Sequence, residues 1–414
     1  MSVELPERAL VLLNDVQVGV LERRGESSRF EPAEAWADLP AGERPVLGQQ
    51  FEEDPFSAHR ARYGAPIWFE HLLPEDGGPL REASARSLDL APARSYPLLL
   101  ALGDDLPGAV KIRPLDATGA PLTVARRERD SVETHPDAAE RLPLRISLAG
   151  VQFKISARIG KRGIAVPASS GEGDWILKFA DQRFPTLPVN EFVTMSWADA
   201  AGIDVPEIRL LDPCSVEGVH ALVANPGDQI FAIRRYDRTD EGRVHQEDLA
   251  QVLGLPPGDA KYRGTNIDTL VSLVSRIAPA DLDELLSRLA FCVLCGNDDA
   301  HAKNWSFWYP DRTSARLSPA YDLVSTIEFL PDNDMSLKIA GARRFADVNR
   351  ERFGRLAERT GLDPKHVDEA VVDAVRRQVE AWHAIRDSAQ MTKPLRAIID
   401  KRLSNLSLVR QCRP

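Results

Sequence analysis

The chain has 414 residues, which is more than one hydrophobic core usually organises, so we expect two or three domains. Hydrophobic residues make up 43% of the sequence and charged residues 28%, and this composition excludes a largely disordered protein. The net charge of −10 excludes broad electrostatic binding to nucleic acid or anionic membrane, so any DNA contact needs a local basic patch or a basic partner.

The first residues, MSVELPER, show no basic and apolar leader pattern, and no apolar run approaches the roughly 20 residues that cross a bilayer. The four cysteines are too few for a disulfide framework in a chain of this length. We therefore expect a cytoplasmic protein that makes no membrane contact.

The N-terminal part of the chain is expected to contain β-structure. Two apolar runs in residues 9–23 flank Asn14-Asp15, a pattern typical of the tight turn in a β-hairpin. Prolines are dense between residues 32 and 107, which predicts short helices. The residues that follow are mostly polar and charged. We predict a β-containing subdomain over residues 1–115 and a linker or mobile loop over residues 116–143.

Residues 144–240 predict an antiparallel sheet. Runs of β-type residues flank glycine-containing turns and end in WILKFA, residues 175–180. NEFVTMSWADAAGI predicts a helix that ends at Gly202, and IRLL and QIFAIRRYD predict further strands.

The remaining residues, 241–414, predict a mostly helical lobe without internal repeats. A helix over residues 281–296 carries an apolar stripe formed by Leu282, Leu285, Leu286, Leu289 and Val293. After it, WSFWY and ARLSPAYDLV are predicted to pair as a hairpin around PDRT.

Directly after the predicted buried helix, the stretch GNDDAHAKN concentrates charged and polar side chains. A phosphoryl-transfer site needs one carboxylate to orient the attacking hydroxyl, and an amide and a second carboxylate to hold metal ions on the nucleotide phosphates. In kinases the base Asp precedes the metal-binding Asn by five positions, and Asp299 and Asn304 have this spacing. Asp322, after the predicted hairpin, stands where a kinase has its second metal-binding residue.

Other parts of a kinase site have candidates upstream. Lys178 in WILKFA has the apolar flanks of a strand lysine that faces a cleft, and Glu191 on the next helix is available to pair with it. SLAGVQFK, residues 147–154, is a candidate for the turn that covers the phosphates, although one glycine is a weak signal. Each feature has a commoner structural role, such as an exposed edge lysine. Their shared order along the chain favours a kinase.

The chain resembles the HipA-like serine/threonine kinases, the toxins of bacterial type II toxin–antitoxin modules. The resemblance covers nearly the whole chain and is carried by WFEHLLPEDG, GDDLPGAVKI, SLAGVQFK, WILKF, NEF, YDRT with VHQED, GNDDAHAKN and SPAYDLVS. It implies an α+β, protein-kinase-like two-lobed fold with a β-rich N-terminal subdomain and a helical C-terminal lobe. Residues 144–240 would then be the ATP-binding sheet and hinge, and residues 241–414 the catalytic lobe.

The resemblance also implies ATP and Mg²⁺ as ligands and a protein substrate, for which the translation machinery is a candidate. Asp299 would be the catalytic base, Asn304 and Asp322 the metal ligands, and Lys178 the phosphate contact, paired with Glu191. The other implied ATP-binding residues are Ala149, Gly150, Val151, Gln152, Phe153, Lys154, Arg234, Arg235, Tyr236, His301 and Lys303.

Two regulatory expectations follow from the same resemblance. Ser147 is implied as an autophosphorylation site. A small helix-turn-helix antitoxin of the HipB type is implied as the partner through which the protein reaches DNA, and the acidic net charge agrees with such an arrangement.

Two positions depart from the kinase pattern. Leu323-Val324 follow Asp322 in place of the Phe-Gly of eukaryotic protein kinases, so the switch behaviour of that motif is not assumed. The bulky Phe153 lies beside Lys154 in the predicted phosphate turn, where a small residue fits more easily.

Other interpretations stay open. Zinc accepts the ligand types of Cys292, Cys295 and His301, but both thiols fall in an apolar helical run, so buried structural cysteines are predicted. A small-molecule kinase uses the same phosphoryl chemistry, and a kinase fold without turnover could act as a co-repressor that binds DNA through an antitoxin. The combined presence of Lys178 and Asp299 with both metal-ligand candidates favours an active protein kinase.

Overall fold

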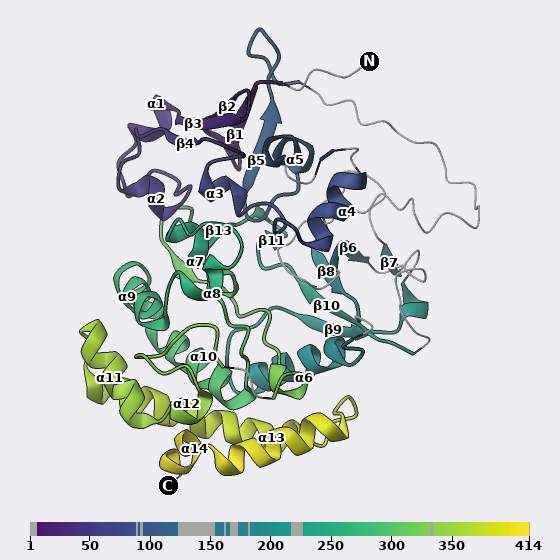
Figure 1. Cartoon of the computed structure of the whole chain (residues 1–414), viewed down its shortest axis with the longest axis vertical. Helices are drawn as coiled ribbons and strands as arrows, with labels where there is room; N and C mark the ends of the chain where they lie inside the picture. The colour runs from purple at the N-terminus through teal and green to yellow at the C-terminus, as the bar shows by residue number, and fades with distance from the viewer. Residues whose placement is uncertain are drawn as a thin grey trace.

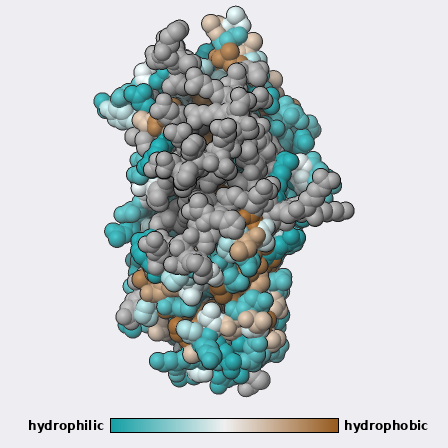
Figure 2. Space-filling view, turned by 90° about the vertical axis from the view of Figure 1, so that its right-hand side faces the viewer, coloured by the Kyte–Doolittle hydropathy of each residue, from teal (hydrophilic) through white to brown (hydrophobic). Residues whose placement is uncertain are grey.

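The computed structural model describes most of the chain. The residues that it describes are 6–87, 90–91, 94–122, 154–160, 163–165, 173–180, 183–216, 227–331 and 334–413. Figure 1 shows an N-terminal sheet domain at the top, a second sheet on the right and the C-terminal helices at the bottom. Within these ranges no helix has the length and apolar character needed to cross a membrane. On the face shown in Figure 2, hydrophilic and hydrophobic side chains alternate over the lower part.

The N-terminal sheet has five antiparallel strands in the order β4-β3-β2-β1-β5. They are β1 (Arg8–Leu13), β2 (Val16–Arg24), β3 (Ser27–Pro32), β4 (His59–Ala61) and β5 (Val110–Pro114). Asn14 turns the chain between β1 and β2 with a φ of 54°, a left-handed conformation that asparagine tolerates. The predicted hairpin is therefore confirmed.

Short helices join this sheet through an aromatic core. They are α1 (Glu34–Ala37), α2 (Gln49–Glu52), α3 (Ile67–Glu70), α4 (Pro79–Ser87) and α5 (Ser95–Leu102), as the dense prolines predict. The ring of Phe30 lies 5.5 Å from that of Phe51 and 5.0 Å from that of Phe69, between centroids. All three rings are fully buried, so sheet and helices share one hydrophobic core.

The second sheet has the order β7-β6-β8-β10-β9, and its strands pair antiparallel as predicted. They are β6 (Lys154–Gly160), β7 (Gly163–Ala165), β8 (Trp175–Lys178), β9 (Ile208–Leu211) and β10 (Ile230–Arg234). Helix α6 (Leu187–Ala200) packs against β9 and β10. Gly202 follows this helix with a φ of 81°, which confirms the predicted helix end.

The C-terminal part is mostly helical, as expected. Its helices are α7 (Leu249–Val252), α8 (Ala260–Arg263), α9 (Ile267–Ile277), α10 (Leu282–Cys295), α11 (Arg350–Thr360), α12 (Pro364–Ile385), α13 (Lys393–Asn405) and α14 (Ser407–Cys412). A small sheet contains β13 (His245–Asp248), β14 (Ser306–Tyr309) and β15 (Arg316–Leu317), and a ribbon contains β11 (Arg238–Thr239) and β12 (Gly242–Arg243). The predicted hairpin is the β14–β15 pair, in which β15 has only two residues.

The predicted buried helix is α10, whose residues from 285 to 295 are all buried. Gly296 ends it with a φ of 71°. A Cβ at this position would lie 2.7 Å from the side chain of Ile327, so both conformation and space require glycine. The chain therefore leaves the helix in a fixed direction as it enters the charged stretch.

Buried polar contacts attach the N-terminal domain to the rest of the chain. The carboxylate of Glu247 on β13 accepts hydrogen bonds from the backbone N–H of Gln49 at 2.9 Å and the indole of Trp68 at 3.1 Å. The hydroxyl of Tyr309 on β14 donates to the same carboxylate at 2.5 Å. Because an unpaired buried carboxylate is costly, these contacts require the two parts to dock in one arrangement.

We predict that replacing Glu247 by glutamine changes how thermal stability depends on pH. Burial raises the pKa of Glu247 to about 7 from 4.5, so the folded protein retains a proton that the unfolded chain releases. As pH rises from about 4.5 to about 7, the contribution of this carboxyl group to the free energy of unfolding therefore falls. The total fall is at most roughly 3 kcal/mol. Calorimetry between pH 5 and pH 8 should show the melting temperature of Glu247→Gln rising relative to wild type.

The exposed Glu351, which pairs with Arg355 on the surface of α11, provides the control. Glu351→Gln should differ from wild type by a constant amount over the same pH range. A constant difference for Glu247→Gln as well would contradict the prediction.

Candidate active site

A buried lysine at the end of β8 joins two acidic side chains from distant segments. Lys178 is 4% exposed, and its Nζ donates to Oε1 of Glu191 at 2.5 Å and also to Oδ1 of Asp322. Glu191 lies on α6, whereas Asp322 follows β15. The structure therefore shows the predicted pairing of Lys178 with Glu191, and Asp322, which was predicted separately, contacts the same ammonium group.

A second lysine extends this charge cluster. Lys154, the first residue of β6, is the register partner of Lys178 and is buried. Burial lowers the pKa of Lys154 to about 8 and raises the pKa of Glu191 to about 7. Asp322 is half-buried, and desolvation opposes its charged form, but Lys178 and Lys154 hold its pKa well below the usual range. Two lysines thus face two carboxylates, which balances charges that would otherwise be costly to bury.

The stretch after α10 is held by its own amide side chains. Asn297 accepts a hydrogen bond at Oδ1 from the backbone N–H of Asp299 at 3.0 Å, and its Nδ2 donates to the carbonyl of Asp322 at 3.4 Å. Asn304 donates from Nδ2 to the carbonyl of Asp299 at 2.9 Å. The structure therefore brings the predicted pair Asp299 and Asn304 together, and Asn297 ties them to the segment of Asp322.

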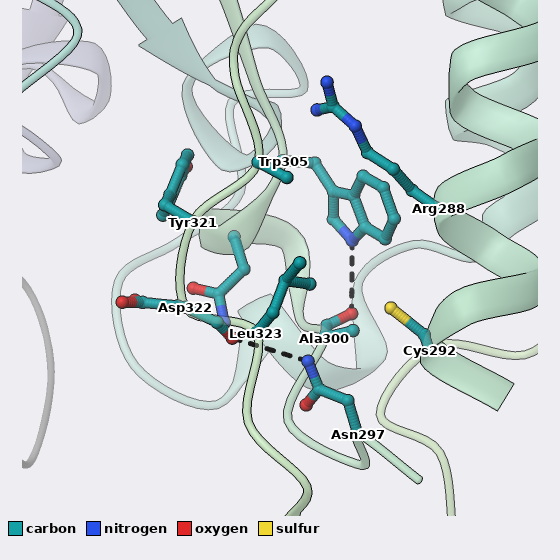
Figure 3. Close-up of a pocket in the computed structure, with 10 residues that line it drawn as sticks. Arg288, Cys292, Asn297, Ala300, Trp305, Tyr321, Asp322 and Leu323 are labelled. Carbon is teal, nitrogen blue, oxygen red and sulfur yellow. Dashed lines mark hydrogen bonds between the residues drawn. The ribbon is translucent and has the colours of Figure 1, made fainter. Parts of the chain in front are cut away.

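Asn297, Asn304 and Asp322 line one small pocket beside α10. Figure 3 shows the carboxylate of Asp322 pointing away from Asn297, which holds the Asp322 backbone. Asp322 has a φ of 53°, a left-handed conformation that is uncommon outside glycine and that clusters at functional sites. Mg²⁺ prefers oxygen ligands. The amide nitrogen of Asn304 is held by the Asp299 carbonyl, so the oxygen that Asn304 would offer to a metal ion is Oδ1. The donor set therefore fits this ion.

The side chain of Asp299 is exposed, yet the pKa of its carboxyl group is raised to about 6. Partial desolvation by the surrounding chain is the main cause, and the charges of Asp298 and Asp322 add to it. Lys261 and a hydrogen bond from Tyr262 lower the pKa and offset part of the rise. A carboxylate with a pKa closer to neutrality is suited to accept a proton from a hydroxyl group.

His301 and Lys303 lie in the same loop as Asp299. The buried ring of His301 contacts the ring of Tyr262 edge-on, with 5.1 Å between centroids. Burial lowers the pKa of His301 to about 3, so this side chain brings no positive charge to the site at neutral pH. Lys303 is half-buried, and its carbonyl accepts a hydrogen bond from the Tyr321 hydroxyl at 2.9 Å.

The predicted adenine hinge follows β10. The guanidinium of Arg235 is buried and ion-paired with Asp105 of the N-terminal domain at 3.2 Å. Arg234 is half-buried, and the ring of Tyr236 stacks on that of Tyr321 with centroids 5.8 Å apart. Asp237 also binds this guanidinium, and the backbone N–H of Arg235 donates to the carbonyl of Asp174 at 2.8 Å, so the side chain and the N–H of Arg235 are both engaged within the protein.

Several predicted residues lie outside the described part of the chain. They are Ser147 and the proposed phosphate-covering turn from Ala149 to Phe153. The predicted linker over 116–143 is described only up to residue 122. These assignments stay predictions.

Cys292 and Cys295 are buried within α10, and both are free thiols. Burial raises the pKa of the Cys292 thiol to about 12, which opposes formation of the thiolate that binds metals. The prediction of buried structural cysteines is therefore confirmed.

Sequence reasoning missed four residues that support the charged stretch. Asn297 lies inside the motif, and its position between the helix end and the paired aspartates was the available signal. Lys261 and Tyr262 lie on α8, a helix of only four residues, and Glu75 lies in a loop of the N-terminal domain. No local pattern marks these three, because tertiary packing alone brings them to the loop.

Two family models match the chain: the HipA N-terminal domain over residues 9–113 and the HipA-like C-terminal domain over residues 146–382. "Putative kinase Y4dM" of Sinorhizobium fredii is 37% identical over 378 residues, which are 89% of this chain and 90% of that protein. "Serine/threonine-protein kinase toxin HipA" of Shewanella oneidensis is 26% identical over 307 residues, 66% of each protein.

A solved structure agrees with these matches. The complex titled "Shewanella oneidensis MR-1 Toxin Antitoxin System HipA, HipB and its operator DNA complex" contains a chain that superposes with a TM-score of 0.69 at 20% identity, covering 98% of this chain and 96% of that one. This likeness confirms the predicted α+β, kinase-like two-lobed fold. With both family models matched in order, and with a relative 37% identical along almost its whole length, the chain belongs to the HipA-like family.

Proposed function

We propose that this chain is an ATP- and Mg²⁺-dependent serine/threonine protein kinase that acts as a growth-inhibiting toxin. The observation that supports this most strongly is the contact of Lys178 with both Glu191 and Asp322, next to a loop that holds Asp299 and Asn304. In kinases, the strand Lys–helix Glu pair and the metal-binding Asp must both be in place for phosphoryl transfer.

Each of these residues has a task in the proposed reaction. Lys178, oriented by Glu191, binds the phosphates of ATP, and Asn304 and Asp322 supply oxygen ligands to Mg²⁺. The metal ion, when bound, neutralises charge on the phosphates. Asp299 orients the acceptor hydroxyl and accepts its proton, while the acceptor oxygen bonds to the γ-phosphorus and the bond from this phosphorus to ADP breaks.

The proposed partner is a small helix-turn-helix antitoxin of the HipB type. The Shewanella relative is seen in a complex with HipB and operator DNA. The present chain has a net charge of −10, so it is poorly suited to neutralise DNA phosphates itself and would reach DNA through a basic partner.

The function is tested by incubating the purified chain with a cell lysate, Mg²⁺ and ATP labelled at the γ-phosphate. We expect label on serine or threonine of a protein, and Asp299→Asn should lower its transfer by at least about 100-fold because the base is lost. Asp298→Asn is the matched control: Asp298 is buried, and its backbone N–H is held by Thr326 at 2.8 Å. Its transfer should stay within about threefold of wild type.

Other outcomes of this experiment would replace the proposal. Label that appears only in small molecules would indicate a small-molecule kinase. Absence of transfer by a folded wild-type chain would favour a kinase fold without turnover. Loss of activity in Asp298→Asn with normal activity in Asp299→Asn would show that the base is assigned to the wrong aspartate.

We predict that Lys178→Met abolishes ATP use and also lowers the melting temperature, because it leaves buried carboxylates without their cation, a loss of about 3–5 kcal/mol. The double variant Lys178→Met/Glu191→Gln removes one of those carboxylates. It should recover part of the stability but none of the activity. Recovery of phosphoryl transfer in the folded double variant would show that Lys178 has a structural role only.

We further propose that Ser147 is an autophosphorylation site that inactivates the enzyme. A phosphate there would bring nearly two negative charges next to the phosphate-covering turn that the sequence predicts at residues 149–153, and it would compete with ATP for the backbone N–H groups of that predicted turn. Mass spectrometry after incubation with ATP and Mg²⁺ should find phosphate on Ser147 in wild type and none in Asp299→Asn. Normal ATP binding by the fully phosphorylated protein would exclude the inhibitory role.

A further inference from the structure

A buried amide on α6 binds the segment that carries Asp322. Asn190, the residue before Glu191, is 1% exposed. Its Oδ1 accepts a hydrogen bond from the backbone N–H of Ser325 at 2.9 Å, and its Nδ2 donates to the carbonyl of Ser325 at 3.1 Å. Both backbone groups of Ser325 are thereby paired with one side chain. Such a two-point contact fixes the orientation of the bound segment as well as its position.

The amide of Asn190 is itself held in one orientation. Besides its bonds to Ser325, its Nδ2 donates to the carboxylate of Glu328 at 2.6 Å. Its Oδ1 accepts from the hydroxyl of Thr194, which lies one turn further along α6, at 3.4 Å. These four bonds use both donors and both acceptor sites of the amide group. A flipped amide would place its own N–H groups against the N–H of Ser325, so the contact has a single arrangement.

The next residue of this segment connects it to the charged stretch after α10. The hydroxyl of Thr326 donates to the carbonyl of Gly296 at 2.9 Å and accepts from the backbone N–H of Asp298 at 2.8 Å. The hydroxyl of Ser325 donates to the carbonyl of Cys295 at 2.7 Å. Carbonyl groups at the end of a helix lack partners within that helix, and here the segment beyond β15 supplies them.

We propose that Asn190 and Thr326 are positioning residues, which hold α6, the Asp322 carboxylate and the charged stretch in one arrangement before any ligand binds. This inference rests on the proposed kinase function. In eukaryotic protein kinases the packing of the Phe in the Asp-Phe-Gly motif sets the active or inactive state, whereas this chain has Leu323 at that position. The hydrogen bonds of Asn190 and Thr326 would supply the alignment instead, without a switch between two states.

The need for this support follows from the backbone of Asp322. Its φ of 53° is an uncommon conformation, which persists only where neighbouring contacts impose it. One such contact is the hydrogen bond from Asn297 to the carbonyl of Asp322, which is long at 3.4 Å. The Asn190 contact fixes the chain three residues later with two shorter bonds. Because small misplacements in an active site cost large factors in rate, the Asn190 contact should control how well Asp322 is aligned.

The first test measures amide hydrogen exchange in the full-length chain without ligands, in peptides that contain Ser325 or Asp298. We expect both peptides to exchange slowly in wild type. Asn190→Leu, which removes the four hydrogen bonds at similar volume, should speed exchange of the Ser325 peptide at least about 10-fold. Thr326→Val should speed exchange of the Asp298 peptide, and Thr326→Ser, which keeps the hydroxyl, should restore it. Protection in wild type that appears only after addition of ATP and Mg²⁺ would overturn the preassembled arrangement.

The second test is kinetic and uses the same variants. With ATP saturating and free Mg²⁺ varied, it measures kcat and the Mg²⁺ concentration that gives half of the maximal rate. We expect Asn190→Leu to lower kcat about 10- to 100-fold and to raise this Mg²⁺ concentration at least about fivefold, because Asp322 is misaligned. The dissociation constant of ADP, measured by calorimetry in EDTA, should stay within about threefold, since Lys178 and Glu191 keep their contact.

Gln378→Met is the matched control, because it also replaces a buried helix amide by an aliphatic side chain. Gln378 on α12 is fully buried and donates to the carbonyl of Ser287 at 2.8 Å, about two turns before the end of α10. This variant should lower the melting temperature, while kcat, the Mg²⁺ requirement and exchange of the Ser325 peptide stay within about twofold of wild type. An equal loss of kcat in Gln378→Met and Asn190→Leu would assign the effect to stability and overturn the positioning role.

The remaining outcomes separate the two levels of the proposal. Should Asn190→Leu not fold, Thr326→Val decides, and a normal kcat in folded Thr326→Val would overturn the positioning role. Hydrogen exchange needs no turnover, so it reports on the network even if the wild-type chain transfers no phosphate, a result that would end the kinase assignment. An active wild type with normal kinetics in Asn190→Leu and Thr326→Val would leave the kinase assignment intact and remove only the positioning role.

Discussion

The arrangement of the site depends on one buried cation. Lys178 lies at the end of a strand where water cannot solvate its ammonium group, so the fold must supply negative charge to it. Glu191 on α6 and Asp322 beyond β15 both do so. Because removing any partner leaves an unpaired buried charge, the second sheet, the helix behind it and the C-terminal part are constrained to assemble together.

A second set of buried polar contacts gives the N-terminal domain a fixed position. Glu247 is bound by three donors, of which two belong to the N-terminal domain, and Arg235 pairs with Asp105 across the same boundary. Such contacts are sensitive to direction in a way that apolar packing is not, so they select one docked arrangement. The loop with Glu75 is thereby brought to α8. Docking of this domain therefore also places Glu75 against Lys261 on α8.

Local sequence patterns predicted many of the helices, strands and turns. The hairpin around Asn14, the end of α6 at Gly202, the stripe of α10 and the strands β9 and β10 all follow from periodicity and turn residues, and the structure confirms them. The site was predictable where its spacing is short. Asp299 and Asn304 lie five residues apart in one loop, so sequence spacing translates directly into the contact that the structure shows.

Local sequence patterns did not predict which charged residues far apart in the chain contact one another. Nothing near Lys178 indicates that its ammonium group also meets Asp322, 144 residues away, or that Lys154 lies opposite it in the sheet. Nothing around Lys261 or Glu75 indicates a contact between them, since Lys261 lies on a helix of only four residues and Glu75 lies in a loop, and neither segment shows periodicity. Residue order therefore established the elements and the types of chemistry. Which charges neutralise one another depended on the folded chain, because burial makes each unpaired charge costly and only packing determines which groups are buried together.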